Sequence, residues 1–336
     1  MPSLNTANTY YVAEAYNVKQ YNAGVVRNDN ERIFEEEGFT ALRFRYTKAG
    51  SLPVKLSRLI SIIQLAFSIK KNSLVVFHFP LLANAYKWLL QMLRLRGVNT
   101  VALIIDIDGL RDKDDMLLKT EIKLLKQFTC IICHNTAMKN KLLEYLPAAK
   151  ISTIQLFDYP AATPPIPRQL SNSISFAGNL NKAKFACNLQ QLKGLQFNVY
   201  GLGYDARLHS KEGSTYKGVV APDLLPAVLE GSFGLVWDGD SIETCDDYLR
   251  YNTPHKLSLY VVAGLPVIVW KDSAAAHLVG ENNIGFTVSS LTEIREKINS
   301  LTAAEYETMR TQVVTIGKQI GNGYFLRKIM DEIKAL

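Results

Sequence analysis

The 336-residue sequence contains no uninterrupted hydrophobic run long enough to cross a bilayer. Its most apolar stretches, such as residues 59–69, are broken by Ser and Gln and fall short of the roughly 20 residues that a membrane-spanning helix needs. The chain does not open with a charged segment followed by an apolar core, so we expect no signal peptide. These absences predict a cytoplasmic location, with peripheral attachment to the inner leaflet as an option.

Residues that bind metals or form disulfides are scarce, with four cysteines and five histidines. Cysteines in a chain without an export signal indicate free thiols rather than a disulfide framework. Cys130, Cys133 and His134 match a haem-attachment pattern, but a spacing of three along a strand sends the two thiols to opposite faces. We therefore expect no haem and no metal there. No zinc signature or RNA-binding motif is present either, which argues against a nucleic-acid-binding protein.

Charge is distributed unevenly along the chain. Residues 1–156 carry 21 Lys and Arg against 13 Asp and Glu, whereas the remainder carries 17 against 18. The basic first half predicts an acidic partner, such as an anionic membrane surface or a lipid pyrophosphate. Segments 55–71 and 85–96 are predicted to be helices with an apolar face and basic ends, as in helices that lie in a membrane interface. The alternative is ordinary packing against a core, with Lys and Arg stems covering apolar surface.

Apolar runs of strand length alternate with helical patterns, which predicts an α/β fold with parallel sheets. Four prolines in residues 160–167 indicate a semi-rigid linker, which we place at 157–170. The predicted domains are 1–156 and 171–312, followed by C-terminal helices in 313–336 that either return to the N-terminal domain or form an interface. The predicted strands are 73–79, 100–105, 128–133, 173–177, 197–200, 233–237 and 266–270.

Glycine, polar and aromatic residues follow three predicted strands of the second half, where open parallel sheets bind their ligands. A helix that begins near Pro254 would direct its N-terminal N–H groups at an anion, and a nucleoside diphosphate suits such a site. The alternative is a solvated Lys256 and a plain turn at 264–266. The candidate donor-binding residues are Gly178, Asn179, Lys182, Tyr200, Gly201, Gly203, Trp237, Tyr248, Tyr251, Asn252, His255 and Lys256.

Several segments carry a resemblance to a known family. They are 234–241, 248–256, 264–271 and 282–285 in the second half, and 22–24, 27–29, 106–111 and 134–138 in the first. In these residues the chain resembles bacterial β-1,6-galactofuranosyltransferases and the related glucosyltransferases of adhesin glycosylation. One departure is Ile105, where the family commonly has His.

The resemblance implies a GT-B fold, in which two Rossmann-like domains face each other across a cleft. It implies a glycosyltransferase that moves a galactofuranosyl or glucosyl unit from a UDP-sugar, bound by the C-terminal domain, to a glycan acceptor of a surface polysaccharide or a glycoprotein. The acceptor would enter from the N-terminal domain, and a lipid-linked acceptor or a homo-oligomer is an option. No cofactor is implied besides the donor substrate. The acceptor-side candidates are Asn22, Gly24, Arg111 and His134.

Glycosyl transfer expels a nucleoside diphosphate, whose developing charge has to be met by cations or helix N-termini. We assign this role to Lys256, with Lys182 and the amides after Asn252. Tyr200, Tyr248 and Tyr251 are candidates for contact with the nucleoside.

A carboxylate has to deprotonate the acceptor hydroxyl if the configuration inverts, and Asp106 and Asp108 are the candidates. The alternative for both is helix capping and pairing with Arg111. Segments 106–108 and 238–240 also match the D-x-D pattern of metal-dependent glycosyltransferases of another fold. Two nucleotide-binding-like halves favour the metal-independent design.

Two other functions stay open. A nucleotide-sugar epimerase of GT-B architecture would bury the sugar without an acceptor groove or a basic face. A catalytically impaired partner subunit would bind the sugar nucleotide while lacking a catalytic residue, as the substitution at Ile105 suggests. Donor hydrolysis separates the last alternative, because a transferase loses some donor to water and a pure binder does not.

Overall fold

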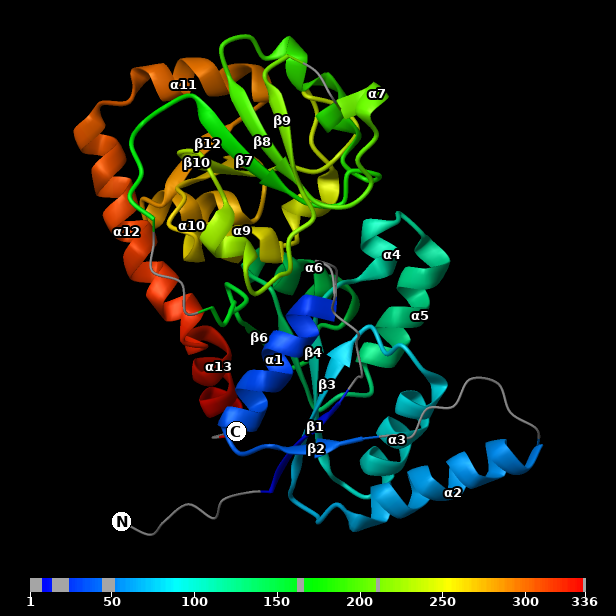
Figure 1. The fold of residues 1–336 in the computed structure, drawn as a ribbon. Helices are drawn as coiled ribbons and strands as arrows, with labels where there is room; N and C mark the ends of the chain where they lie inside the picture. Colours follow the sequence, from blue (N-terminus) through cyan, green and yellow to red (C-terminus); the bar gives the residue numbers. More distant parts are fainter. Residues whose placement is uncertain (1–7, 14–23, 44–51, 162–165, 210–211, 335–336) are drawn as a thin grey trace, which may run out of the picture. The chain divides into compact units, whose positions relative to one another are not determined.

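The computed structural model describes residues 8–13, 24–43, 52–161, 166–209 and 212–334, with the backbone alone for 52–58. The chain divides into two compact units, and Figure 1 shows a sheet flanked by helices in each. Unit 1 comprises residues 1–16, 27–154 and 326–336, and unit 2 comprises 17–26 and 155–325. Both sheets have six strands, and every strand pair is parallel.

The sheet of unit 1 has the order β2-β1-β3-β4-β5-β6. Its middle strands are buried along nearly their whole length, because helices cover both faces of a parallel sheet. The strands are β1 (Thr9–Val12), β2 (Thr40–Leu42), β3 (Leu74–Phe79), β4 (Asn99–Ile104), β5 (Cys130–Cys133) and β6 (Ile151–Thr153). The helices are α1 (Gly24–Glu36), α2 (Leu52–Ser68), α3 (Asn84–Leu95), α4 (Asp108–Arg111), α5 (Asp115–Leu125), α6 (Thr136–Tyr145) and the C-terminal α13 (Tyr324–Lys334).

Helix α13 belongs to unit 1 although it is the last helix of the chain. Arg327 near its start forms ion pairs with Glu36, the last residue of α1, at 2.6 Å, and with Glu37 directly after it. Its buried residues Leu326, Ile329, Met330 and Ile333 follow the spacing of one helix face. The break before α13 falls at Asn322 and Gly323, and Gly323 adopts the positive φ of 70° that favours glycine.

The sheet of unit 2 has the order β12-β11-β10-β7-β8-β9, so the strand order reverses between β7 and β10. Such a reversal is the point where open parallel sheets bind ligands. The strands are β7 (Ser173–Ala177), β8 (Gln196–Tyr200), β9 (Ser214–Gly218), β10 (Phe233–Val236), β11 (Val267–Trp270) and β12 (Gly285–Val288). The helices are α7 (Ala206–His209), α8 (Leu225–Val228), α9 (His255–Val262), α10 (Ala275–Glu281), α11 (Ile294–Ser300) and α12 (Ala303–Gly321), with short 3-10 helices at Lys184–Gln191, Asp247–Arg250 and Leu291–Glu293.

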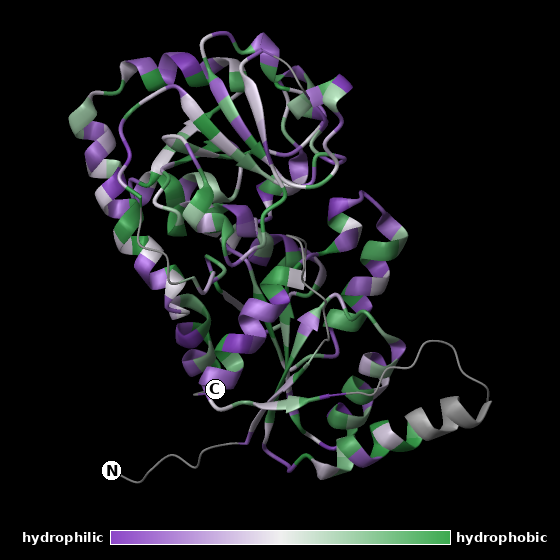
Figure 2. Ribbon diagram, viewed as in Figure 1, coloured by the Kyte–Doolittle hydropathy of each residue, from purple (hydrophilic) through white to green (hydrophobic). Residues whose placement is uncertain are grey.

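Helix α9 lies in the core of unit 2, and nearly all of its residues are buried. It begins near the switch point, the place between β7 and β10 where the strand order reverses. It packs closely on β10, since a Cβ at Gly234 would come within 2.2 Å of the Tyr260 ring. On its other side it meets α12, where a Cβ at Gly317 would come within 2.7 Å of the Val261 carbonyl oxygen. In Figure 2 hydrophobic residues, in green, run along the central strands of the unit 1 sheet and along helix α9. This packing fixes the first turn of α9 against the ends of the strands.

The seven strands predicted from the sequence are all confirmed, as is the parallel α/β architecture. The sequence missed five further strands, β1, β2, β6, β9 and β12. These have three to five residues, and most are only partly buried, so they lack the continuous apolar run that marks a central strand. All described cysteines are free thiols. Among the helices of the described residues, none is long and apolar enough to cross a membrane.

The first residues of the segment expected as a linker are buried in unit 2. The Ser258 hydroxyl donates to the Phe157 carbonyl at 2.6 Å, and a ring nitrogen of His255 lies 3.1 Å from the Asp158 carbonyl oxygen. Tyr159 donates its hydroxyl to the Pro222 carbonyl. These contacts attach the chain to helix α9 and to the loop before α8 ahead of the proline-rich segment.

Candidate functional site

Lys256 is the central cation of the candidate site in unit 2. It lies in the first turn of α9, and its Nζ is 2.6 Å from Oδ1 of Asp238, which follows β10. The same Nζ lies 3.4 Å from the Trp237 carbonyl oxygen and 5.3 Å from the centre of the Phe176 ring on β7. The side chain of Lys256 is 13% exposed, against 41% for Asp238. The two strands that supply its contacts are the pair that flanks the switch point.

Two more lysines follow β7. Lys184 pairs with Asp240 at 2.9 Å, and both side chains are mostly exposed. Lys182 is exposed as well. The Asn179 side chain accepts a hydrogen bond from the Asn181 backbone N–H at 3.0 Å, which forms the turn that carries these lysines.

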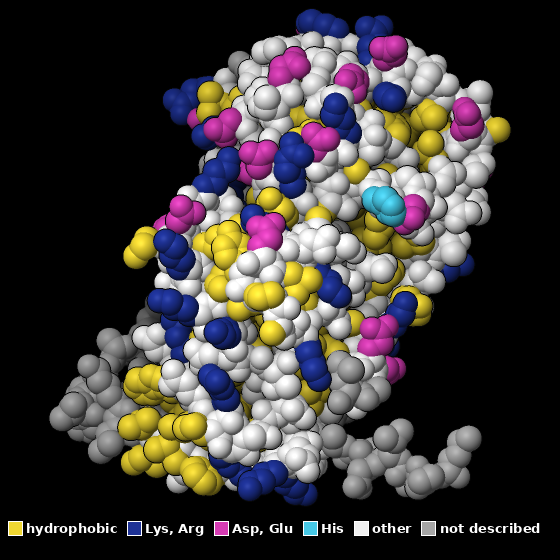
Figure 3. Space-filling model, turned by 180° about the vertical axis from the view of Figure 1, so that it is seen from behind, with side chains coloured by type: hydrophobic (Ala, Val, Ile, Leu, Met, Phe, Trp, Pro, Cys, Tyr) yellow, Lys and Arg dark blue, Asp and Glu magenta, His cyan; other side chains and the backbone are white. Residues whose placement is uncertain are grey.

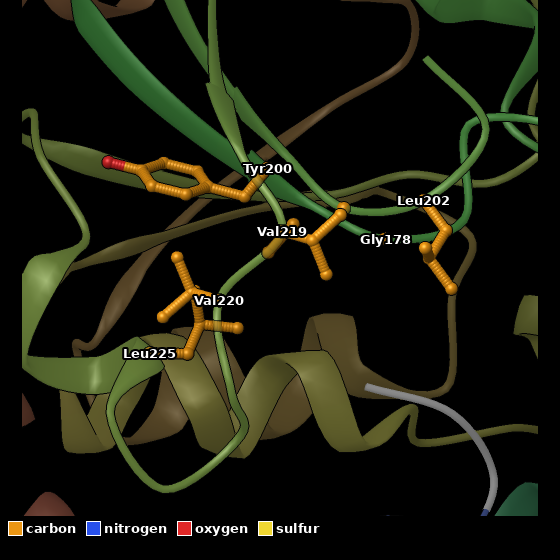
Figure 4. A pocket seen from close by; sticks show the side chains of 8 residues that line it. Gly178, Tyr200, Leu202, Val219, Val220 and Leu225 are labelled. Atoms are coloured by element: carbon orange, nitrogen blue, oxygen red, sulfur yellow. The ribbon is translucent and has the colours of Figure 1, made fainter. Parts of the chain in front are cut away.

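A small pocket opens at the carboxyl ends of β7 and β8, and Figure 4 shows it with its lining side chains as sticks. Its walls are mostly apolar, with backbone from the two glycine-containing strand ends. The Tyr200 hydroxyl points away from the pocket, where it donates to the Val228 carbonyl at 3.0 Å and accepts from the Glu230 N–H at 3.1 Å. The lining residues are Ala177, Gly178, Tyr200, Gly201, Leu202, Val219, Val220 and Leu225.

The glycines at these strand ends form hydrogen bonds and close contacts with neighbouring loops of the protein. Gly178 donates its N–H to the Tyr200 carbonyl at 3.0 Å, and Gly201 donates to the Gly218 carbonyl at 3.0 Å. Gly201 has a φ of 126°, and a Cβ there would lie 1.9 Å from the Gly178 carbonyl oxygen. Gly203 also has a positive φ, of 84°, and meets the Asn181 side chain. The space beside the Gly201 Cα is therefore occupied by the backbone that follows β7.

Three aromatic candidates lie inside the fold. Trp237 is fully buried, and its Nε1 donates to the Ser241 carbonyl at 3.0 Å, which closes the loop after β10. The His255 ring stacks on Tyr159 with ring centres 4.9 Å apart, and burial lowers the pKa of His255 to about 4, so its imidazole is neutral at pH 7. Tyr248 is buried in the turn before α9. Tyr251 and Asn252, between that turn and α9, are half-buried.

In unit 1, Asp106 and Asp108 follow β4 and share Arg111. The Nη1 atom of Arg111 lies 2.8 Å from Asp108 and 3.2 Å from Asp106, and its Nε lies 2.9 Å from Asp112. Burial disfavours the charge on Arg111, but the hydrogen bond to Asp112 and the charges of the other two carboxylates outweigh it and raise its pKa. The pairing with Arg111 that the sequence offered as an alternative is therefore present.

The sequence reasoning missed Glu121, a residue of α5 that binds the backbone of the Asp106–Arg111 segment. Its carboxylate accepts the backbone N–H of Asp108 at 3.0 Å and of Gly109 at 2.8 Å, and the residue is 5% exposed. Burial raises the pKa of Glu121, and the two N–H groups oppose that shift. A signal was available, because Glu121 falls between Leu118 and Leu125 on the buried face of α5, where a charge needs a partner.

We expect Glu121→Ala to lower the free energy of unfolding of unit 1 by about 1–3 kcal/mol, because it leaves two largely buried N–H groups without an acceptor. Urea unfolding of the full chain, compared with Glu144→Ala, measures the effect. Glu144 is an exposed carboxylate of α6 that pairs with Lys141 at 2.7 Å, so its loss is expected to change stability by less than about 0.5 kcal/mol. Equal stability of the two variants would remove Glu121 from its supporting role.

Of the remaining acceptor-side candidates, the structure describes Gly24 and His134. Gly24 begins α1, and His134 is buried directly after β5. Asn22 lies outside the described residues. Within the part of the chain that the structure describes, no three His, Cys, Asp or Glu side chains cluster as metal ligands would. Burial raises the pKa of both Cys133 and Cys245 to about 12, which keeps these thiols protonated at neutral pH.

Both halves of the chain match one protein family. The N-terminal domain of glucosyltransferase 3-like proteins matches residues 9–154, and the C-terminal domain matches 174–333. The β-1,6-galactofuranosyltransferase WbbI of Escherichia coli (strain K12) is 31% identical over 291 residues, which cover 83% of this chain and 85% of that protein. The chain belongs to this family. Glucosyltransferase 3 of Streptococcus gordonii, 27% identical over 319 residues and 93% of each chain, is a further relative of this glucosyltransferase 3-like protein.

Solved structures agree on the fold of this glucosyltransferase 3-like protein. Sucrose-phosphate synthase from Thermosynechococcus elongatus has a TM-score of 0.60 at 13% identity and covers 98% of this chain and 96% of its own. A glycosyltransferase from Rickettsia africae has a TM-score of 0.56 at 12% identity and covers 98% of each chain. The fold is GT-B, with two Rossmann-like units, as the sequence predicted. As a family member the chain is a glycosyltransferase, which favours this function over the epimerase and the non-enzymatic partner subunit.

Proposed function

We propose that this glycosyltransferase moves a hexosyl unit, galactofuranosyl or glucosyl, from a UDP-sugar to a glycan acceptor. The names of its relatives give both sugars, and one solved structure of the same fold, from E. coli, holds UDP-2-fluoro glucose. The observation that carries the proposal is the Lys256 ammonium at the switch point of unit 2, held in the first turn of α9. A diphosphate at this position would meet a full positive charge and a helix N-terminus.

Asp238 occupies the anion position beside Lys256, at 2.6 Å. In our proposal its carboxylate stands where a phosphoryl oxygen of the donor would bind, and the incoming diphosphate takes over the ammonium. Lys182, exposed after β7, supplies a second cation from the opposite side of the switch point. As the sugar leaves, charge grows on the diphosphate, and a preorganised ammonium stabilises it more than the ground state. This design is metal-independent and needs no cofactor.

The nucleoside is proposed to bind toward the pocket at the ends of β7 and β8. Gly178 connects the surroundings of Lys256 with this pocket, because it follows Phe176 and Ala177 on β7 and lines the pocket itself. Apolar side chains and two glycines in the pocket wall suit the face of a flat base. Tyr251 and Asn252 are proposed as further donor contacts, whereas Trp237, Tyr248 and His255 support the site from within the fold.

Asp106 and Asp108 are proposed to act on the acceptor hydroxyl, with Arg111 and His134 on the acceptor side. Arg111 orients both carboxylates, and Glu121 fixes the backbone that carries them. A carboxylate held in this way accepts a proton from a hydroxyl group that approaches it. We propose that the acceptor is a glycan of a surface polysaccharide or a glycoprotein, reached from the cytoplasm, and that a lipid-linked acceptor suits the basic first half.

Thermal unfolding with UDP, UDP-glucose, UDP-galactose and UDP-galactofuranose tests the donor. A ligand that binds only the folded protein stabilises it by about 2.7 kcal/mol at 100 times its dissociation constant. We expect each effective uridine ligand to raise the melting temperature, the true donor most, and ADP and GDP to have little effect. The absence of a shift with all four uridine compounds would refute the UDP-sugar assignment.

A further inference from the structure

Helices α2 and α3 of unit 1 keep an apolar stripe on their outer side. On α2, Ile62 and Ala66 are buried, as is Ile69 directly after the helix ends. On the opposite side of α2, exposed apolar residues recur at spacings of three and four and form a stripe. Of the fourteen large hydrophobic side chains that are exposed in the described residues, six lie between positions 60 and 95. They are Ile60, Ile63, Phe67, Leu82, Trp88 and Leu95.

Phe67 and Leu95 are the most exposed of the six, at 67% and 88%. Figure 3 shows the apolar side chains as a yellow patch at the lower left, and Figure 1 identifies the helices there as α2 and α3. The Arg96 guanidinium stacks over the Phe67 ring at 4.9 Å and donates to the Ala66 and Ile69 carbonyls, the latter at 2.9 Å. Arg96 thereby fastens the end of α3 to the end of α2, so that the two stripes form one rigid surface, which we call the α2–α3 face.

The chain segment that carries the α2–α3 face has charges of a single sign. Residues 38–105 contain ten Lys and Arg and no Asp or Glu. Lys70 and Lys71, directly after α2, and Arg94, in the last turn of α3, are exposed at the same ends as Phe67 and Leu95. Apolar side chains bordered by cations are the composition of helices that lie in the headgroup region of an anionic membrane.

We propose that the α2–α3 face docks this glycosyltransferase on an anionic phospholipid bilayer, with Phe67, Trp88 and Leu95 entering the headgroup region and the flanking cations meeting lipid phosphates. Two copies paired through this face would bring cation against cation, which disfavours a symmetric dimer there. The inference deepens the proposed function, on which it rests for the location of the acceptor. Its test uses no donor, so the two proposals fail independently.

Co-sedimentation of the full chain with vesicles tests the docking. We expect binding to phosphatidylcholine vesicles that contain 30% phosphatidylglycerol, little binding to pure phosphatidylcholine, and loss of binding in 0.5 M NaCl. The double variant Phe67→Gln/Leu95→Gln is expected to lower the partition coefficient at least tenfold, and Lys70→Gln/Lys71→Gln to lower it as well. The matched control is Met116→Gln, an exposed apolar residue of unit 1 outside this face, which is expected to leave binding unchanged.

Trp88 provides a direct reporter of insertion. It is 46% exposed, whereas the other two tryptophans, Trp237 and Trp270, are buried, so a blue shift on adding anionic vesicles comes from Trp88 and disappears in Trp88→Phe. A wild-type chain that stays in the supernatant with anionic vesicles would overturn the proposal. So would a dimer in sedimentation velocity that Phe67→Gln/Leu95→Gln dissociates, because a second copy would then cover the face.

Discussion

Lys256→Ala is expected to lower kcat/KM for the UDP-sugar by about 10²–10³-fold and to abolish the thermal stabilisation by UDP. Loss of one preorganised group that meets the developing charge costs about 3–4 kcal/mol in the transition state. The side chain is 13% exposed and stands between a carboxylate and an aromatic ring, so water replaces it poorly. Steady-state kinetics with a radiolabelled donor, together with melting curves with and without UDP, measure both effects.

Two further variants define what Lys256 does. Lys193→Ala removes a lysine of unit 2 that is 72% exposed and pairs loosely with Glu212 at 3.6 Å, and we expect it to match the wild type in both assays. Asp238→Asn removes the anion that competes for the ammonium, and we expect tighter binding of free UDP. Undiminished kcat/KM in Lys256→Ala would show that the diphosphate binds elsewhere, while equal losses in Lys193→Ala would show a general effect of charge.

Gly201→Ala is expected to destabilise unit 2 by about 3–5 kcal/mol. Two costs add, because the φ of 126° is strained for any residue with a Cβ and the new methyl group would lie 1.9 Å from the Gly178 carbonyl oxygen. The collision is with backbone, so no side-chain rotation relieves it, and β7 and β8 have to separate at their carboxyl ends. Urea unfolding followed by tryptophan fluorescence in a Trp88→Phe background reports on unit 2 alone, since Trp237 and Trp270 both lie there.

Two other glycines of unit 2 separate the two costs. Gly218→Ala has a positive φ of 93° but no atom within 4 Å of the new methyl group, so it should lose only about 1 kcal/mol of backbone strain. Gly280→Ala, in helix α10, meets neither obstacle and should be neutral or stabilise by about 0.5–1 kcal/mol. If Gly201→Ala were no worse than Gly218→Ala, the close approach to Gly178 would not hold the strand ends together.

The central strands were predictable because they are buried on both faces and therefore apolar along their whole length. Phe77, Val101 and Ile131 sit in such runs, and each lies in a confirmed strand. Edge strands such as β2 and β9 face solvent on one side, and their mixed sequences do not distinguish them from loops. Local sequence patterns were therefore enough to predict the central strands, but not the edge strands.

The sequence indicated where in unit 2 the candidate site lies, but not what each of its residues does there. The sequence pointed to the ends of β7, β8 and β10, since glycine and polar residues follow apolar strands there. It did not reveal that His255 stacks on Tyr159 with a neutral ring, or that Trp237 is wholly buried. The environment of His255 depends on contacts with the segment 157–161, which is far from α9 in the sequence. The burial of Trp237 depends on its packing in a core cluster that includes Phe176 and Leu249.

The sequence by itself determined the parallel α/β architecture, the basic first half and the family, because apolar periodicity, charge and motif spacing are written in consecutive residues. Tertiary structure alone decided which charges meet. The pairing of Lys256 with Asp238, the sharing of Arg111 by two carboxylates, and the hold of Glu121 on the Asp106–Arg111 segment arise where separate elements pack. Electrostatic and hydrogen-bond energies depend on distance and burial in space, and a linear sequence states neither.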